Sequence, residues 1–153
     1  MSSHTGAMFS ISIMAIPAFL AAPAPIALKQ FNTIYQIGKV SSPPSCLFTA
    51  GTFFYLSYCS HPSFSHASID SQIGWKYYLA ASACAGIVVP FTYVVLEKTS
   101  QELLRLEKID GESLKDEDKT RVGMLLRRWK ILNLIRSGML AASTIIGFYP
   151  AFN

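Results

Sequence analysis

The chain has 153 residues, of which 51% are hydrophobic and only 14% are charged. A soluble domain carries about 25% charged residues, so this composition argues against an ordinary water-facing surface. The length allows one domain. The net charge of +4 does not indicate nucleic-acid binding, because nine of the thirteen basic residues lie among eight of the nine acids, between residues 97 and 130. The remaining stretches are almost uncharged, as membrane spans are.

The sequence predicts an all-α fold, a four-helix transmembrane bundle in one membrane domain of residues 1–153. The four spans are expected at about residues 6–28, 42–60, 75–96 and 129–149. The first span contains Pro17, Pro23 and Pro25, which a membrane helix tolerates where neighbouring helices satisfy the freed carbonyls. A secretory signal peptide is the competing interpretation. It would need a basic segment ahead of its apolar stretch, and no Lys or Arg precedes residue 29.

The second span begins with residues typical of a helix N-terminus, and the third and fourth contain small residues. The second begins at Ser42-Pro43-Pro44, a favourable N-cap with proline in the first turn, and is short and rich in Ser, Thr and Tyr. Small residues that allow close helix contact occur in the third and fourth spans: Ala81, Ala85 and Gly86, and then Gly138, Ala142 and Gly147.

The distribution of basic residues predicts the orientation. Loops 29–41 and 97–128, with their immediate flanks, carry eleven Lys and Arg, whereas the opposite side has Lys76 alone. Cytosolic loops are enriched in basic residues. We therefore expect both loops to be cytosolic and both termini to be lumenal, in an internal membrane.

The charged loop between the third and fourth helices is expected to be helical. Apolar residues recur at helical spacing from Leu103 to Ile109 and again from Leu114 to Leu126, and Asp110-Gly111 marks a turn between them. The simplest interpretation is two helix extensions that emerge into solvent. The alternative is a docking surface for other enzymes of a pathway.

Arg136 lies inside the fourth span, whose only other charged residue is Lys130 at its start. A charged residue costs at least about 2.5–3.5 kcal/mol at the centre of a membrane helix, so it usually faces a partner or a polar cavity. Trp129, Asn133 and Arg136 follow one another at i, i+4 and i+7, which places them on one helix face. One interpretation is that Arg136 extends back to the headgroups. The other is that Asn133 and Arg136 line a polar pocket and present donors to an oxyanion.

The third span ends in a second group of candidate residues. Pro90 frees a carbonyl one turn earlier, and Thr92 can form a local hydrogen bond. Glu97 is the carboxylate nearest to Arg136 in depth, so it is expected to pair with Arg136 or to act as a base. The alternatives are a simple kink at Pro90 and an acid at the membrane interface.

The sequence predicts no metal and no cofactor. Cys46, Cys59 and Cys84 form no CxxC pair and are expected to be free thiols. The three histidines lie in the N-terminus and the middle loop and are not at ligand spacing. No glycine-rich nucleotide-binding motif and no nucleophile elbow occurs.

Four segments, in this order and spacing, resemble the anthrone oxygenase-like family of small four-helix membrane proteins known from fungal polyketide pathways. They are GAMFSISIMAIPAF, FNTIYQIGKVSSP with Tyr35 and Gly38, VPFTYVVLEKTSQELL and LLRRWKILNLIRSGML. The resemblance covers nearly the whole chain, and Pro-Phe-Thr and Trp-x-x-x-Asn-x-x-Arg are its specific parts. After Pro-Phe-Thr the family often has Thr-Asn-x-x-Leu. Here Ser100 follows Thr99, so a hydroxyl replaces the amide.

The resemblance implies a monooxygenase that oxidises an anthrone to an anthraquinone with molecular oxygen, in aromatic polyketide biosynthesis. An anthrone has an acidic methylene, and its enolate can react with oxygen without flavin or metal. The alternative function is a non-catalytic membrane scaffold or a lipid-binding protein. The residues expected to act are Arg136 and Asn133 on the oxyanion, Glu97 as base, and Trp129, Phe91, Thr92 and Tyr93 as walls of the substrate pocket.

Overall fold

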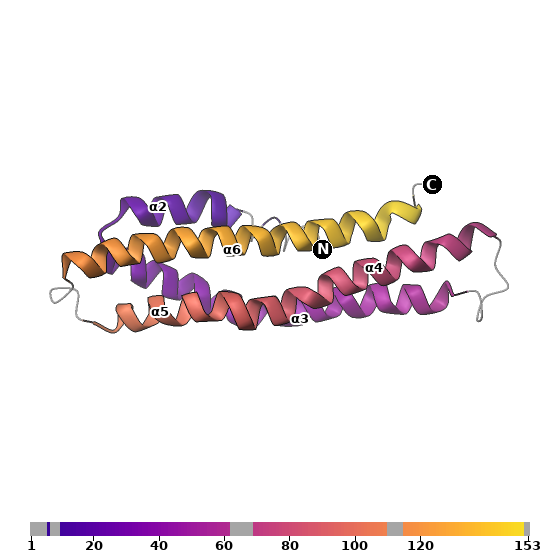
Figure 1. The fold of residues 1–153 in the computed structure, drawn as a ribbon, viewed down its shortest axis with the longest axis horizontal. Helices are drawn as coiled ribbons and strands as arrows, with labels where there is room; N and C mark the ends of the chain where they lie inside the picture. The colour runs from indigo at the N-terminus through magenta and orange to yellow at the C-terminus, as the bar shows by residue number, and fades with distance from the viewer. Residues whose placement is uncertain (1–5, 7–9, 62–68, 110–114, 152–153) are drawn as a thin grey trace.

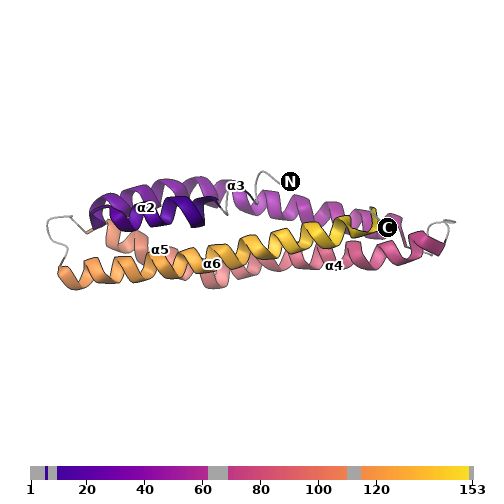
Figure 2. The same cartoon turned by 90° about the horizontal axis from the view of Figure 1, so that it is seen from above.

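The computed structural model describes residue 6 and residues 10–61, 69–109 and 115–151. Every regular element in these ranges is helical, which confirms the all-α prediction. The helices form an elongated bundle in which three long helical rods run side by side and a short N-terminal segment packs along one half of their length (Figures 1 and 2).

The N-terminal segment consists of η1 (Ile11–Ala15) and α2 (Ile16–Ala21). The chain then reverses at Ala22, whose backbone is extended (φ −87°, ψ 156°). This is the conformation imposed on a residue that precedes proline, here Pro23. The prediction of one helix over residues 6–28 is therefore wrong. The helix ends at Ala21, and its stretch Ile11–Ala21 is apolar but shorter than a membrane span.

The next helix, α3 (Ala24–Cys59), is continuous. The prediction of a loop at residues 29–41 is wrong, because Leu28, Phe31 and Tyr35 recur at helical spacing and are buried against the neighbouring helices. Pro43 and Pro44 lie inside the helix and do not start it. Proline disrupts a helix less where other contacts hold the backbone, and here 36 residues, about 54 Å of helix, pack along the bundle.

The second rod is made of α4 (Ile69–Phe91), η2 (Thr92–Leu96) and α5 (Glu97–Glu107). After residues 110–114, where the predicted turn at Asp110-Gly111 lies outside the described residues, α6 runs from Asp116 to Phe148 and is followed by η3 (Tyr149–Ala151). Residues 97–107 and 116–128 are thus two helix extensions, as predicted. Three acids in the first turn of α6 favour its N-terminus through the helix dipole.

The elements η1 and η2 are π-helical turns, each close to a proline. The turn η1 directly precedes α2, whose first turn contains Pro17, and η2 begins two residues after Pro90. A proline has no backbone N–H and so cannot donate the hydrogen bond that an α-helix needs at that position. A local change to i→i+5 hydrogen bonds is one way in which a helix accommodates the missing bond. Single π-turns are frequent at functional sites. Both turns here contribute residues to the cavity described below.

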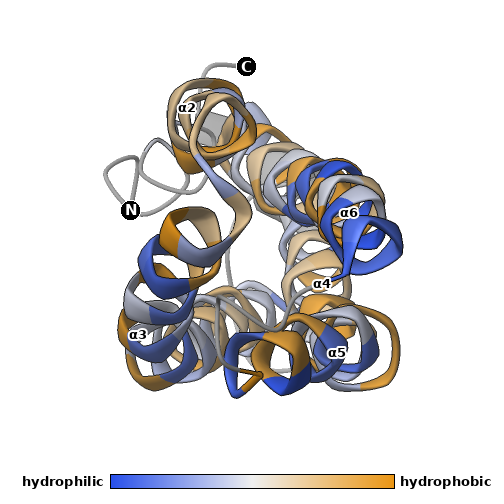
Figure 3. Ribbon diagram, turned by 90° about the vertical axis from the view of Figure 1, so that its left-hand side faces the viewer, coloured by the Kyte–Doolittle hydropathy of each residue, from blue (hydrophilic) through white to orange (hydrophobic). Residues whose placement is uncertain are grey.

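The bundle has two hydrophobic clusters. The larger one joins α2, the first half of α3, α5 and the first half of α6, and includes Ile16, Phe31, Leu103 and Leu126. The smaller one, at the far end, joins α3, α4 and α6 around Val88. Viewed from the end that holds the larger cluster, the outer faces of α3, α5 and α6 are strongly hydrophilic, whereas α2 is mostly apolar (Figure 3).

Three of the predicted small residues, Ala81, Ala85 and Gly147, are closely packed in the half of the bundle away from the larger cluster. Ser143 of α6 donates to the carbonyl of Ala81 at 2.8 Å, and Ala85 is fully buried. Gly147 packs on the ring of Phe53, where an added methyl group would overlap the ring. Gly86 and Gly138 face open space, so their predicted role in packing is wrong.

Two helical stretches, Gly74–Glu107 and Asp116–Phe148, are long and apolar enough to cross a membrane. They contain the predicted third and fourth spans. The helix α3, which contains the predicted second span, does not meet the same test, and Ile11–Ala21 is apolar but shorter. Membrane character is thus supported by length and composition in two helices.

Candidate functional site

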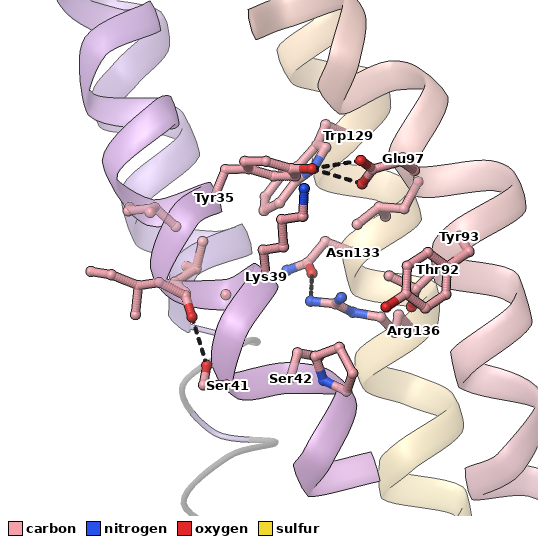
Figure 4. Close-up of a pocket in the computed structure, with 16 residues that line it drawn as sticks. Tyr35, Lys39, Ser41, Ser42, Thr92, Tyr93, Glu97, Trp129, Asn133 and Arg136 are labelled. Carbon is pink, nitrogen blue, oxygen red and sulfur yellow. Dashed lines mark hydrogen bonds between the residues drawn. The ribbon is translucent and has the colours of Figure 1, made fainter. Parts of the chain in front are cut away.

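A cavity of about 230 Å³ borders the larger hydrophobic cluster, whose Tyr35, Leu96 and Trp129 are part of its lining. Its walls come from α3, η2 and α6, and Ile11 of η1 adds to them (Figure 4). Six of the seven predicted site residues line it: Arg136, Asn133, Glu97, Trp129, Thr92 and Tyr93. The seventh, Phe91, is half-buried at the end of α4 and is not part of the lining.

Arg136 is buried, with 7% of its surface exposed, so its side chain is enclosed by the helices of the bundle. Its Nη2 donates to Oδ1 of Asn133 at 2.6 Å, and Nδ2 of Asn133 donates in turn to Oγ of Ser12 at 2.7 Å. The Nε atom of Arg136 has no hydrogen-bond partner among the described residues. Buried charges in proteins are normally paired. A buried guanidinium that is held by an amide and has no carboxylate partner among the described residues could bind an anion.

Glu97 does not pair with Arg136. Its carboxylate accepts hydrogen bonds from the Tyr35 hydroxyl at 2.7 and 2.8 Å, and Gln101 Nε2 lies 3.3 Å from its Oε1. Burial, and next the hydrogen bond to Glu97, raise the pKa of the Tyr35 phenol, so this group stays protonated and remains a donor. The cavity therefore holds an oriented carboxylate and a cation that are not bonded to each other.

Trp129 forms one wall and is fixed on two sides. Its Nε1 donates to Oγ of Ser100 at 3.1 Å, and Ser100 donates to the carbonyl of Leu96 at 3.0 Å. The ring of Phe31 meets the indole edge to face, with centroids 5.3 Å apart. Ser100 stands where the resembled family often has an amide. The hydroxyl found here holds the indole in place.

The residues that sequence reasoning missed are on the N-terminal half of α3 and on η1. Tyr35, Lys39 and Ser42 line the cavity, and Ser12 holds Asn133. The segment around Tyr35 was singled out by its resemblance, but the loop predicted there gave it no position relative to Glu97. The spacing of Leu28, Phe31 and Tyr35, three and four residues apart, indicates a helix and was the sequence signal that could have placed Tyr35.

Among the described residues no group of three or more His, Cys, Asp and Glu side chains is placed to hold a metal ion. The polar side chains that line the cavity are instead one carboxylate, one guanidinium, one lysine ammonium, one amide and several hydroxyls, beside aromatic and aliphatic groups.

Comparison with known proteins decides the family. Residues 31–146 match the family described as Anthrone oxygenase. This chain belongs to the anthrone oxygenase family. It is 27% identical to the anthrone oxygenase nsrD of Aspergillus novofumigatus over 94% of this chain and 83% of that protein. It is 26% identical to the anthrone oxygenase dmxR16 of a Cryptosporiopsis species, over 94% of this chain and 76% of that protein.

No solved structure gives a significant match to this chain. The segment matched to the anthrone oxygenase family contains every cavity-lining residue except Ile11. The cavity is therefore built almost wholly from the part of the chain that carries the family relationship.

Proposed function

We propose that this protein oxidises the central methylene of an anthrone to a carbonyl with molecular oxygen, giving an anthraquinone, in the synthesis of an aromatic polyketide. The observation that carries this proposal is the Arg136 guanidinium, buried without a carboxylate partner among the described residues, in the same cavity as the Glu97 carboxylate. Membership of the family and the names of the two relatives supply the reaction class.

The reaction needs a base and a site for negative charge. Glu97, oriented by Tyr35, removes a proton from the methylene, and the charge moves to the anthrone oxygen. Arg136 stabilises that oxyanion, because donors placed in advance in a water-poor site cost no reorganisation during reaction. Asn133 positions Arg136 through their 2.6 Å hydrogen bond. This is a different role from direct contact with the oxyanion.

Oxygen then accepts the electrons. The electron-rich enolate carbon transfers an electron to oxygen and recombines with it, and the resulting hydroperoxide loses water to leave the new carbonyl. One oxygen atom ends in the quinone and the other in water, with no further reductant consumed. The protein contributes position, charge and exclusion of water, so we propose that the reaction is independent of a cofactor.

The size and lining of the cavity suit this substrate class. Its volume of about 230 Å³ lies below the roughly 300–1,000 Å³ of sites for drug-sized ligands, which favours a small rigid ring system. Trp129, Tyr93 and Thr92 supply flat or apolar walls, as in most small-molecule sites.

The decisive experiment uses purified protein in detergent with an anthrone and follows oxygen uptake above the spontaneous rate. Arg136→Ala should lower the rate, whereas Arg127→Ala, which removes an exposed charge from the same helix, should not. Metal and flavin content of the active protein are assayed in the same preparation. Equal rates for wild type and Arg136→Ala would remove the basis of the proposed mechanism.

We also propose that the protein is integral to an internal membrane, with the charged tip, formed by residues 29–39 and 97–128, in the cytosol. The C-terminal end of α6 lies at the other end of the bundle and is proposed to be lumenal (Figure 1). Residues 1–5, on which the predicted lumenal N-terminus depends, are outside the described residues.

A second candidate function, docking of pathway enzymes, is favoured by the charged tip. The outer faces of α5 and α6 expose charged residues, and a shallow cavity between them is lined by Glu102, Arg105, Asp118 and Arg121. Deletion of part of the connection, Asp110 to Lys119, should impair a scaffold and spare an oxygenase, whereas Arg136→Ala should do the reverse.

A further inference from the structure

The end of the bundle away from the charged tip carries a group of aromatic residues with polar edges. Tyr58 lies near the end of α3, Trp75 and Tyr77 lie near the start of α4, and Tyr149 follows α6. The rings of Tyr77 and Tyr149 are in contact, with centroids 5.0 Å apart. Trp and Tyr concentrate at membrane–water interfaces. We call these four residues the aromatic belt.

The cavity lies about one hydrocarbon thickness from this belt along two separate rods. Trp129 is 20 positions before Tyr149, which is about 30 Å at 1.5 Å per residue. Tyr93 is 18 positions after Trp75, about 27 Å by the same rise. The hydrocarbon core of a bilayer is about 30 Å thick. If the belt marks one interface, the cavity lies at the other.

The surface between these levels suits lipid. Residues 40–59 and 77–96 contain no Asp, Glu, Lys or Arg, and residues 131–149 contain only Arg136, which is buried. Large apolar side chains face outward in this zone, such as Ile87, which is 56% exposed. Charged residues resume at Lys39 on α3 and at Glu97 and Lys98 after η2.

The opening of the cavity lies at the level where the uncharged surface ends and charged residues resume. Figure 4 looks between α3 and η2, with α6 behind the cavity, and shows Lys39 on one side and Tyr93 on the other. Tyr93 is 58% exposed, and the Lys39 ammonium lies over the Tyr35 ring at 5.8 Å from its centroid. A cation on one side of the opening and an exposed aromatic ring on the other match the polarity of the headgroup boundary.

We propose that the cavity is loaded from the bilayer, through the opening between α3 and η2, which lies in the interfacial layer of the leaflet next to the charged tip. The ligand is a rigid aromatic with phenolic oxygens, which partitions into that layer, and Lys39 attracts its negative edge. The identity of the ligand rests on the proposed function, whereas the position of the opening does not.

The position is tested by tryptophan depth in lipid vesicles. Tyr93→Trp and Ile87→Trp are made in a chain whose native Trp75 and Trp129 are replaced by Phe. The vesicles contain lipids brominated near the headgroup or near the chain ends. We expect the residue 93 fluorophore to be quenched most by shallow bromines and little by aqueous iodide, and the residue 87 fluorophore to be quenched most by deep bromines. If the chain with both native tryptophans replaced by Phe does not fold, each new tryptophan is introduced into the wild-type chain. Its fluorescence is then obtained by subtracting the emission of the wild-type protein.

The loading is tested with anthrone as the probe, and Val94→Trp is the matched control. Val94 adjoins Tyr93 and is equally exposed, at 59%, but does not line the cavity. Anthrone should protect Tyr93→Trp, and not Val94→Trp, from shallow quenching. Strong iodide quenching or deep quenching of Tyr93→Trp overturns the route even in a protein that oxidises anthrone. Shallow quenching without protection overturns the ligand, whereas the proposed function is decided separately by oxygen uptake of the wild-type protein.

Discussion

Replacing Arg136 with Met separates catalysis from stability. Met has a similar length and no charge, and the change removes a buried cation whose Nε has no partner among the described residues. An unsatisfied buried polar atom costs about 1–3 kcal/mol, and exchange of buried charge for apolar packing is often neutral or stabilising by about 1–4 kcal/mol.

One loss opposes this gain in stability. Asn133 Oδ1 no longer accepts from the guanidinium, which costs about 1–3 kcal/mol if the oxygen stays buried without a donor. The net expectation is a free energy of unfolding that is unchanged or higher by up to about 2 kcal/mol. The rate of anthrone oxidation should fall by about 10²–10³, which is the effect of removing one oxyanion donor.

The assay pairs denaturant unfolding in detergent with oxygen uptake by the same preparation. Arg127→Met, on the exposed face of the same helix, is the control for loss of a positive charge. A variant of Arg136 that unfolds more easily by over 2 kcal/mol, and whose activity falls only in proportion to its folded fraction, would show that the guanidinium is structural. The reasoning from an unpaired cation to an anionic ligand would then be refuted.

Three further changes have distinct expected outcomes. Gly147→Ala should lower the free energy of unfolding by about 1–3 kcal/mol through overpacking, whereas Gly138→Ala should leave it equal or slightly higher; equal effects of the two would contradict the packing. Tyr35→Phe keeps the ring but removes the donor to Glu97, a charge-assisted bond of about 1.5–3 kcal/mol, so kcat should fall about 10- to 100-fold with the fold retained by circular dichroism. An unchanged kcat would remove Tyr35 from the mechanism. Glu102→Gln breaks an exposed ion pair on the charged tip and should change thermal unfolding by less than about 1 kcal/mol, and a larger change would mean that the pair is structural.

The amino-acid pattern alone was sufficient for much of the site. Trp129, Asn133 and Arg136 share a face because a helix repeats every 3.6 residues, and this local geometry does not depend on the rest of the fold. Two other predictions also rested on local sequence: the scarcity of charge in the third and fourth spans and the helical spacing on both sides of residues 110–114. The structure confirms the helices there.

Only the tertiary structure decided what stands opposite that face. Tyr35 meets Glu97 across 62 positions of sequence, and Ser12 meets Asn133 across 121, and no local pattern encodes either pair. The same holds for α3. Its polar residues 29–41 and its Pro43-Pro44 look like a loop and a helix start in isolation, yet packing against α5 and α6 keeps them helical. Burial of Phe31 and Tyr35 is available only in the folded bundle, and it outweighs the local preference of prolines to end a helix.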